Sequence, residues 1–199
     1  MPTMGRPREF DRDVALQAAM LVFWRKGFLA TSVNDLCDAM GIRSPSLYAA
    51  FGSKENVYVE AVQLYNGIAD SLIWNHIGDG PSVREGMRKL LQAAAEVLPG
   101  ESEKPAGCMV NLATVGEECP GAVPDTLRQA RLDVLARVHA GLKRGVGAGE
   151  LPRSTNVDRL ARFYVGVVQG MAIQAYDGAT RAELEGVARM AMSAWPASS

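Results

Sequence analysis

The chain has 199 residues, of which 48% are hydrophobic and 22% are charged. This is the composition of an ordinary globular protein, and it excludes an intrinsically disordered, collagen-like or low-complexity chain. Lys and Arg number 21 against 22 Asp and Glu, so the overall charge gives no indication of nucleic-acid binding.

The cysteines and the apolar segments narrow the class of protein further. Cys37, Cys108 and Cys119 are too few for a disulfide framework, and their spacing matches no zinc signature. The first ten residues lack the apolar segment of a secretory signal peptide. The longest uncharged stretch that could suggest a membrane helix has 14 residues, between Arg162 and Asp177, against the roughly 20 that span a bilayer. We therefore expect a cytoplasmic protein with no membrane partner.

Apolar residues recur at helical spacing along almost the whole chain, and the period-two alternation of strands is nearly absent. Start and stop signals divide the chain into about nine helices, which predicts an all-α fold. These signals are densest near the N-terminus. We therefore expect a three-helix domain with a helix-turn-helix over residues 1–55, followed by a longer helical domain over residues 56–199.

Capping residues mark the first helices in chain order. Asp11 can cap the first helix, which is expected to end at Gly27. Ser32 can cap a second helix, which Gly41 closes after two turns. Ser44 can cap a third short helix, and a long fourth helix follows it. A short helix, a tight glycine turn and another short helix form the helix-turn-helix arrangement.

The third helix has two distinct faces. Leu47 and Phe51 fall on one side and are expected to be buried. The other residues are small or can form hydrogen bonds: Ser44, Ser46, Tyr48 and Ala49. Small exposed residues let a helix enter the major groove, which is roughly 12 Å wide, where hydroxyl and methyl groups can meet base edges. This helix is therefore predicted to read DNA.

Groups suited to phosphate contacts surround this helix. They lie at the starts of the second and fourth helices, in the turn, and in an N-terminal arm that could reach a minor groove. These residues are Thr31, Ser32, Arg43, Ser53, Lys54, Arg6 and Arg8. Plainer roles stay open, since serines are common helix caps, Tyr48 could cover the core, and the arm could be a solvated tail.

The order and spacing of these residues resemble the DNA-binding domain of the tetracycline-repressor (TetR) family. The similarity covers about residues 5–60 and rests on Gly5-Arg6-Pro7-Arg8-Glu9-Phe10-Asp11, Phe23-Trp24-Arg25-Lys26-Gly27-Phe28, Thr31-Ser32-Val33, Gly41-Ile42, Ser46-Leu47-Tyr48, Phe51 and Ser53-Lys54-Glu55. The resemblance implies a homodimeric transcription factor, usually a repressor, that binds a palindromic operator and is released by a small molecule. It implies no enzymatic activity.

The third helix lacks the side chains that make the strongest contacts with bases. It contains no Lys, Arg, Asn or Gln, so bidentate contacts with bases must be sparse. Specificity is then expected to depend on Arg43, on the N-terminal arm and on DNA shape.

Five further helices are expected after the fourth: 82–99, a short one at 108–117, 124–146, 156–177 and 180–195. The stretch 163–176 is apolar on almost all sides, and the last helix carries an apolar stripe. We predict that both helices form the subunit interface, and a single-chain core is the alternative. The interface residues are Phe163, Gly166, Val167, Gly170, Ile173, Leu184, Val187, Ala188, Ala191 and Trp195.

Large or polar-tipped residues within apolar helices are candidates for a ligand pocket, because such pockets are mostly apolar with few polar groups. No cluster of charge is evident, so the expected inducer is neutral and hydrophobic or aromatic. The pocket candidates are Tyr65, Trp74, His76, Met87, Cys108, Met109, Asn111, His139, Phe163, Tyr164 and Met171.

Two other functions stay open. A redox-responsive regulator would act through Cys108 and Cys119. A helical enzyme is less favoured, because the chain has no nucleophile elbow, Walker loop, H-E-x-x-H or C-x-x-C motif. The histidines and the two cysteines do not match a known metal spacing, so we expect no metal, no cofactor and no catalytic residue.

Overall fold

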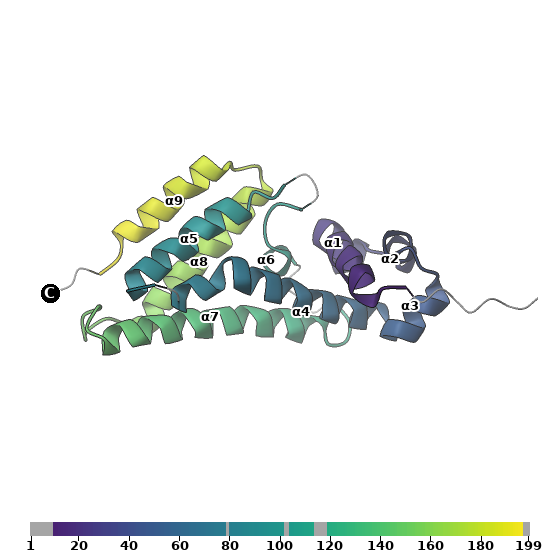
Figure 1. Ribbon diagram of the computed structural model, residues 1–199, viewed down its shortest axis with the longest axis horizontal. Helices are drawn as coiled ribbons and strands as arrows, with labels where there is room; N and C mark the ends of the chain where they lie inside the picture. Colours follow the sequence, from purple (N-terminus) through teal and green to yellow (C-terminus); the bar gives the residue numbers. More distant parts are fainter. Residues whose placement is uncertain (1–9, 79, 102–103, 114–118, 197–199) are drawn as a thin grey trace, which may run out of the picture.

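The computed structural model describes residues 10–78, 80–101, 104–113 and 119–196. These residues form nine α-helices and one short 3-10 helix, without a strand, which confirms the predicted all-α fold (Figure 1). The elements are α1 (Arg12–Ala30), α2 (Val33–Met40), α3 (Ser44–Phe51), α4 (Lys54–Leu72), η1 (Trp74–Gly78), α5 (Val83–Val97), α6 (Met109–Leu112), α7 (Val123–Gly147), α8 (Val157–Tyr176) and α9 (Arg181–Ser193).

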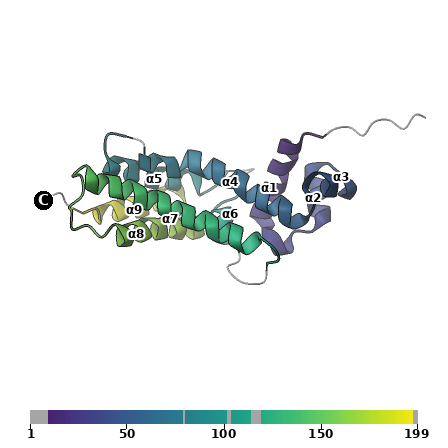
Figure 2. The same ribbon diagram turned by 90° about the horizontal axis from the view of Figure 1, so that it is seen from below.

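The helices are arranged along one long axis. Helices α1, α2 and α3 form one end of the molecule, and α5, α8 and α9 pack together toward the other end (Figures 1 and 2). Two long helices, α4 and α7, lie side by side along the axis. Helix α4 packs against α1 near its start and against α7 and η1 farther along, so it physically joins the two parts.

An aromatic cluster holds the N-terminal end together. The Tyr58 ring of α4 meets two rings of α1 edge-on, with centroid distances of 4.8 Å to Phe23 and 5.2 Å to Phe28. Leu47 and Phe51 of α3 are buried in the same continuous core, as the sequence predicted. An isolated helix of eight residues is unstable in water, so this burial is what keeps α3 folded.

Helix ends differ from the sequence expectations by small amounts. Gly27 breaks α1 with a φ of 75°, but one further turn follows it before the chain leaves the helix at Ala30. Arg43, rather than Ser44, occupies the N-cap position of α3, and no side chain caps that helix. The short helix expected at 108–117 is a single turn among its described residues. The 3-10 helix was not predicted.

Among the helices of the described ranges, none has the length and apolarity to cross a lipid bilayer.

Replacement of Leu47 by Ala is expected to lower the free energy of unfolding by about 2–5 kcal/mol, because the side chain has no exposed surface and a cavity would remain. The neighbouring substitution Tyr48→Ala should change it by less than about 0.5 kcal/mol, since that ring is 49% exposed. Urea denaturation followed by circular dichroism measures both. Equal losses for the two variants would contradict the placement of α3.

Candidate nucleic-acid interface

The turn between α2 and α3 depends on Gly41. Its φ of 64° and ψ of 30° lie in the left-handed region, where a side chain would add strain. The backbone N–H of Gly41 donates to the carbonyls of Asp38 and Cys37, and the N–H of Ile42 donates to Cys37 at 3.1 Å. These bonds close α2 and set the direction in which the chain enters α3.

Helix α3 has the two faces that the sequence predicted. Leu47 is completely buried and Phe51 nearly so, whereas Tyr48 and Ala49 are exposed and Ser46 is half-buried. Ser44 faces α2 instead, with its Oγ 3.6 Å from the Sγ of Cys37. The exposed surface of α3 is therefore short and consists mostly of small side chains, with the ring of Tyr48 as its one large group.

Arg12 fixes the far end of α3, a role that the sequence analysis missed. Its guanidinium lies 4.3 Å from the centroid of the Phe51 ring and donates to the carbonyl of Ala50 at 3.4 Å. The same group forms an ion pair with Glu60 at 2.8 Å. One side chain thus connects α1, α3 and α4. The contacts join residues about forty positions apart, and nothing in the local sequence marks them.

The start of α4 contributes a basic residue, Lys54, to the surface around α3. The ammonium of Lys54 lies 4.3 Å from the centroid of the Phe28 ring, and the residue is half-buried. The hydroxyl of Ser53 accepts the N–H of Asn56 at 3.2 Å, so Ser53 is a helix cap. Hydrogen bonds from its own backbone N–H and from Ser53 lower the pKa of Glu55, which keeps this carboxylate charged beside Lys54.

The start of α2 is less suited to phosphate than the sequence suggested. The Ser32 hydroxyl and the Asp35 carboxylate form a reciprocal capping box, and Lys26 pairs with Asp35 at 2.6 Å. These hydrogen bonds, above all the one from Lys26, hold the pKa of Asp35 far below its usual value. The prediction that Thr31 contacts phosphate is wrong for its side chain. Thr31 is only 1% exposed, and its hydroxyl donates to the carbonyl of Gly27 at 2.7 Å.

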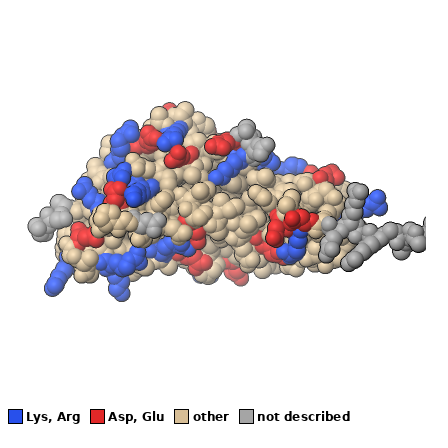
Figure 3. Space-filling view, viewed as in Figure 1, with Lys and Arg blue, Asp and Glu red and all other residues tan. Residues whose placement is uncertain are grey.

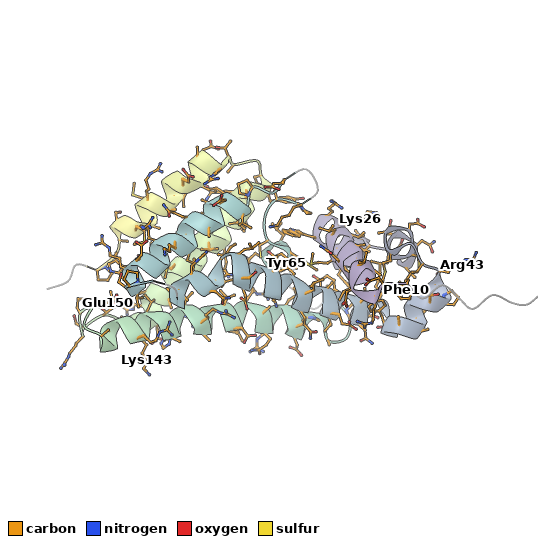
Figure 4. The ribbon with its side chains drawn as sticks, in the orientation of Figure 1. Phe10, Lys26, Arg43, Tyr65, Lys143 and Glu150 are labelled. Carbon is orange, nitrogen blue, oxygen red and sulfur yellow. The ribbon has the colours of Figure 1, made fainter. Side chains whose placement is uncertain are left out.

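Charge on the surface is mixed rather than concentrated. Acidic and basic side chains are interspersed on the face that Figure 3 shows. Arg43 stands at the tip of the molecule, in the turn between α2 and α3 (Figure 4). Arg6 and Arg8 lie outside the described residues. Arg43 and Lys54 are therefore the predicted basic contacts that the structure places beside α3.

A pocket of about 110 Å³ lies between α4, α6, α7 and α8, well away from α3. Four of the predicted ligand residues line it: Tyr65, Trp74, Cys108 and Asn111. The sequence analysis missed most of its polar walls, because these residues read as solvated positions of amphipathic helices. They are Asn66, Asp70, Arg131, Asp133, Arg137 and Gln169.

The other predicted ligand residues do not line this pocket, for different reasons. Met87, Met171 and Tyr164 are packed in the core, and the Tyr164 hydroxyl donates to the carbonyl of Ala191 at 3.4 Å. His139 lies 3.3 Å from the Asp158 carboxylate. The remaining three, which also lie outside the lining, are His76 of η1, the buried Met109 of α6 and the exposed Phe163 of α8.

The predicted interface residues of α8 and α9 fall into two groups. On α8, Phe163 is 42% and Ile173 is 50% exposed, and Gly166, Val167 and Gly170 share this partly open side. On α9 the prediction is wrong for Leu184, Ala188 and Ala191, which are buried within the chain because α9 packs on α5 and α8. Val187 and Trp195 also pack against this core, and the Trp195 ring lies 5.9 Å from that of Tyr164.

Two family models match most of the chain. The model for bacterial regulatory proteins of the tetR family matches residues 15–61, and the model for the tetracyclin repressor-like C-terminal domain matches residues 85–191. The chain belongs to the TetR family. The first match covers the helix-turn-helix and the start of α4, and the second covers the helices around the pocket.

Individual TetR relatives agree with this assignment. A cysteine mutant of the TetR family transcriptional regulator CifR, solved with 26-bp double-strand operator DNA, has a TM-score of 0.90 and 40% identity, covering 96% of this chain and 100% of that chain. The HTH-type transcriptional repressor ComR of Escherichia coli (strain K12) is 32% identical over 197 residues, which are 96% of this chain and 92% of ComR. The repressor BdcR of the same strain is 39% identical over 106 residues, 53% of each chain. This TetR family member is therefore a DNA-binding transcriptional regulator and not an enzyme.

Substitution of Arg12 by Ala should weaken DNA binding about tenfold while changing the melting temperature little. The expected stability effect is small because its ion pair is exposed and a cation–π contact contributes only about 0.5–1 kcal/mol. Fluorescence anisotropy with a DNA fragment selected by the wild-type protein measures the affinity. Arg128→Ala, at an exposed position of α7, is the control, and unchanged affinity in the Arg12 variant would show that α3 needs no such support.

Proposed function

We propose that this TetR family member is a homodimeric repressor that binds a palindromic operator through α3 and is released when a small molecule occupies the pocket beside Tyr65. The observation that carries the DNA-binding part is the geometry of α3. Its residues Leu47 and Phe51 are buried, Arg43, Tyr48 and Ala49 are exposed, and Ser46 and Lys54 are half-buried at its edges. A surface of this shape fits a major groove, and the two cations fit the flanking phosphates.

A second copy of the chain is required by the geometry of DNA. Recognition helices of a dimer bind half-sites about 34–36 Å apart, or a multiple of that distance. The outer side of α8 supports this assembly, because Phe163 and Ile173 expose apolar surface there beside two helical glycines. A Cβ atom at Gly166 or Gly170 would point into open space in the single chain, so a partner helix could approach closely.

Helix α4 provides the connection between pocket and DNA. It begins at Lys54, beside α3, and its later turns carry Tyr65, Asn66 and Asp70 on the pocket wall. The Tyr65 ring also meets the Trp24 ring of α1 edge-on at 4.9 Å. A ligand that changes the position of this wall would shift α4 and α1 together, and with them the spacing of the two α3 helices. The ligand shifts this equilibrium only by its differential affinity for the two states.

The redox alternative has less support than ligand release. Cys119 is buried, which limits the access of an oxidant to its thiol. Burial also raises the pKa of the Cys108 thiol, which lowers the fraction of reactive thiolate.

Tyr48→Ala and Lys54→Ala should each reduce operator affinity about tenfold or more, because one removes the large ring of α3 and the other a phosphate contact. The folded state should persist in both, which circular dichroism can verify. The DNA is the fragment that wild-type protein selects from sheared genomic DNA, and affinity is measured by anisotropy. If both variants bind like wild type, α3 and the start of α4 are not the DNA surface.

Gly170→Arg should convert the dimer into monomers, because the outer side of α8 is open in the single chain but would be crowded between two copies. Gly67→Arg on α4 is the matched control, since it is also a helical glycine with open space around its Cβ position. Light scattering measures the mass of each variant. A Gly170→Arg dimer, or loss of both dimers alike, would refute the proposed interface.

A further inference from the structure

We propose that the molecule that fills the pocket is a small organic acid whose carboxylate pairs with Arg131. This inference rests on the proposed function, in which the pocket between α4, α6, α7 and α8 holds the effector. It departs from the neutral ligand expected from sequence. The reason lies in how the charged residues of the pocket wall are paired.

Among the described residues of this wall, Arg131 is the cation that has no acidic partner. It is half-buried, and its Nη1 donates to the carbonyl of Val110 at 3.5 Å, the outer limit of a hydrogen bond. No carboxylate in the described part of the chain forms an ion pair with it. A partly desolvated guanidinium with one long hydrogen bond is poorly satisfied.

Arg137, six residues along the same helix, shows the contrasting case. Its guanidinium contacts the Asp70 carboxylate at 2.6 Å and the side-chain oxygen of Asn75 at 2.5 Å. Asp70 is therefore already neutralised. Asp133, the other acid of the wall, is exposed and accepts a hydrogen bond from Gln129 at 2.7 Å. Within the described residues, the half-buried part of the pocket thus keeps one positive charge without a carboxylate beside it, at Arg131.

A carboxylate matches that charge in geometry as well as in sign. The guanidinium is a planar fork of N–H donors that binds two carboxylate oxygens at once. Asn111 lies in the same lining and can donate further hydrogen bonds through its side-chain amide. Burial raises the pKa of Tyr65 well above its usual value, so this side chain stays neutral, and its hydroxyl is hydrogen-bonded to Cys108.

The size and walls of the pocket limit the rest of the ligand. Its volume of about 110 Å³ is below the ~150 Å³ of a cavity that holds benzene, so a ligand with more than one ring would need the pocket to expand considerably, and a ligand with one ring or a short aliphatic chain would need only a small expansion. Tyr65 and Trp74 provide aromatic surface, and Val134 and Val165 provide aliphatic surface. Walls of this kind suit a ligand that has one acidic group and is otherwise apolar.

Matched pairs of acids and amides test the charge preference in the full-length dimer. Benzoate, phenylacetate and hexanoate are each compared with their neutral amides, and binding is followed by tryptophan fluorescence, because Trp74 lines the pocket. At least one acid should bind ten times more tightly than its amide. Equal binding of acid and amide in all three pairs, or no binding by any acid, overturns the proposal.

Arg131→Gln should abolish the preference, and Arg131→Lys should retain part of it because the charge remains without the planar fork. Arg128→Gln, an exposed arginine three residues earlier on α7, should leave the preference unchanged. A preference that persists in Arg131→Gln assigns the charge to another residue and overturns the proposal. Should Arg131→Gln fail to fold, the wild-type comparison of acids and amides decides the question.

The outcomes separate this inference from the proposed function. If amides bind the pocket and release DNA as well as acids do, effector release stands and the acidic ligand is wrong. If acids bind through Arg131 but never change the affinity for the selected DNA fragment, the ligand class stands and the proposed release is wrong.

Discussion

The burial of two side chains, Leu47 and Phe51, is the constraint on which the rest of this molecule depends. Eight residues cannot hold a helix in water without tertiary contacts, and only a fixed helix can present the same surface to DNA each time. The core that buries these two side chains is continuous with the aromatic cluster of Phe23, Phe28 and Tyr58 on α1 and α4. Arg12 then holds the last turn of α3 in place through its contacts with Phe51 and Ala50. The exposed residues of α3 are free to be small because none of them is needed to hold the helix in place.

The same aromatic cluster provides a physical route for the proposed effect of the pocket on DNA binding. Helix α4 contributes Tyr58 to the aromatic cluster and, two turns farther along the same helix, Tyr65 to the pocket wall. Trp24 of α1 contacts Tyr65 directly. Any displacement of the pocket wall therefore acts on both helices that support α3. The proposal that a ligand releases DNA depends on this shared helix more than on the pocket alone.

Local signals in the sequence were sufficient to predict the α-helices and the buried face of α3. Capping residues and glycines act over three or four positions, so Ser32, Gly41 and Ser53 marked helix ends that the structure confirms. Long-range contacts were not accessible in this way. Thr31 looked like a phosphate contact because its bond to Gly27 and its burial were invisible. Leu184, Ala188 and Ala191 form a convincing interface stripe in sequence, but an apolar stripe cannot tell which partner covers it. The pairing of Arg137 with Asp70, after which Arg131 has no carboxylate partner among the described residues, likewise links residues 67 positions apart.

A distance measurement between two copies of α3 tests the central claim most directly. Spin labels attached at Ala49, in a chain whose three cysteines are replaced by serine, report the separation of the outward faces in the dimer bound to its selected DNA fragment. The account predicts one narrow distance near 34–36 Å or a multiple of it, within the length of the labels, and a different or broader distribution when the pocket is filled. A separation that fits no whole number of helical turns, or labels that become buried within the chain, would contradict an α3 that faces the DNA.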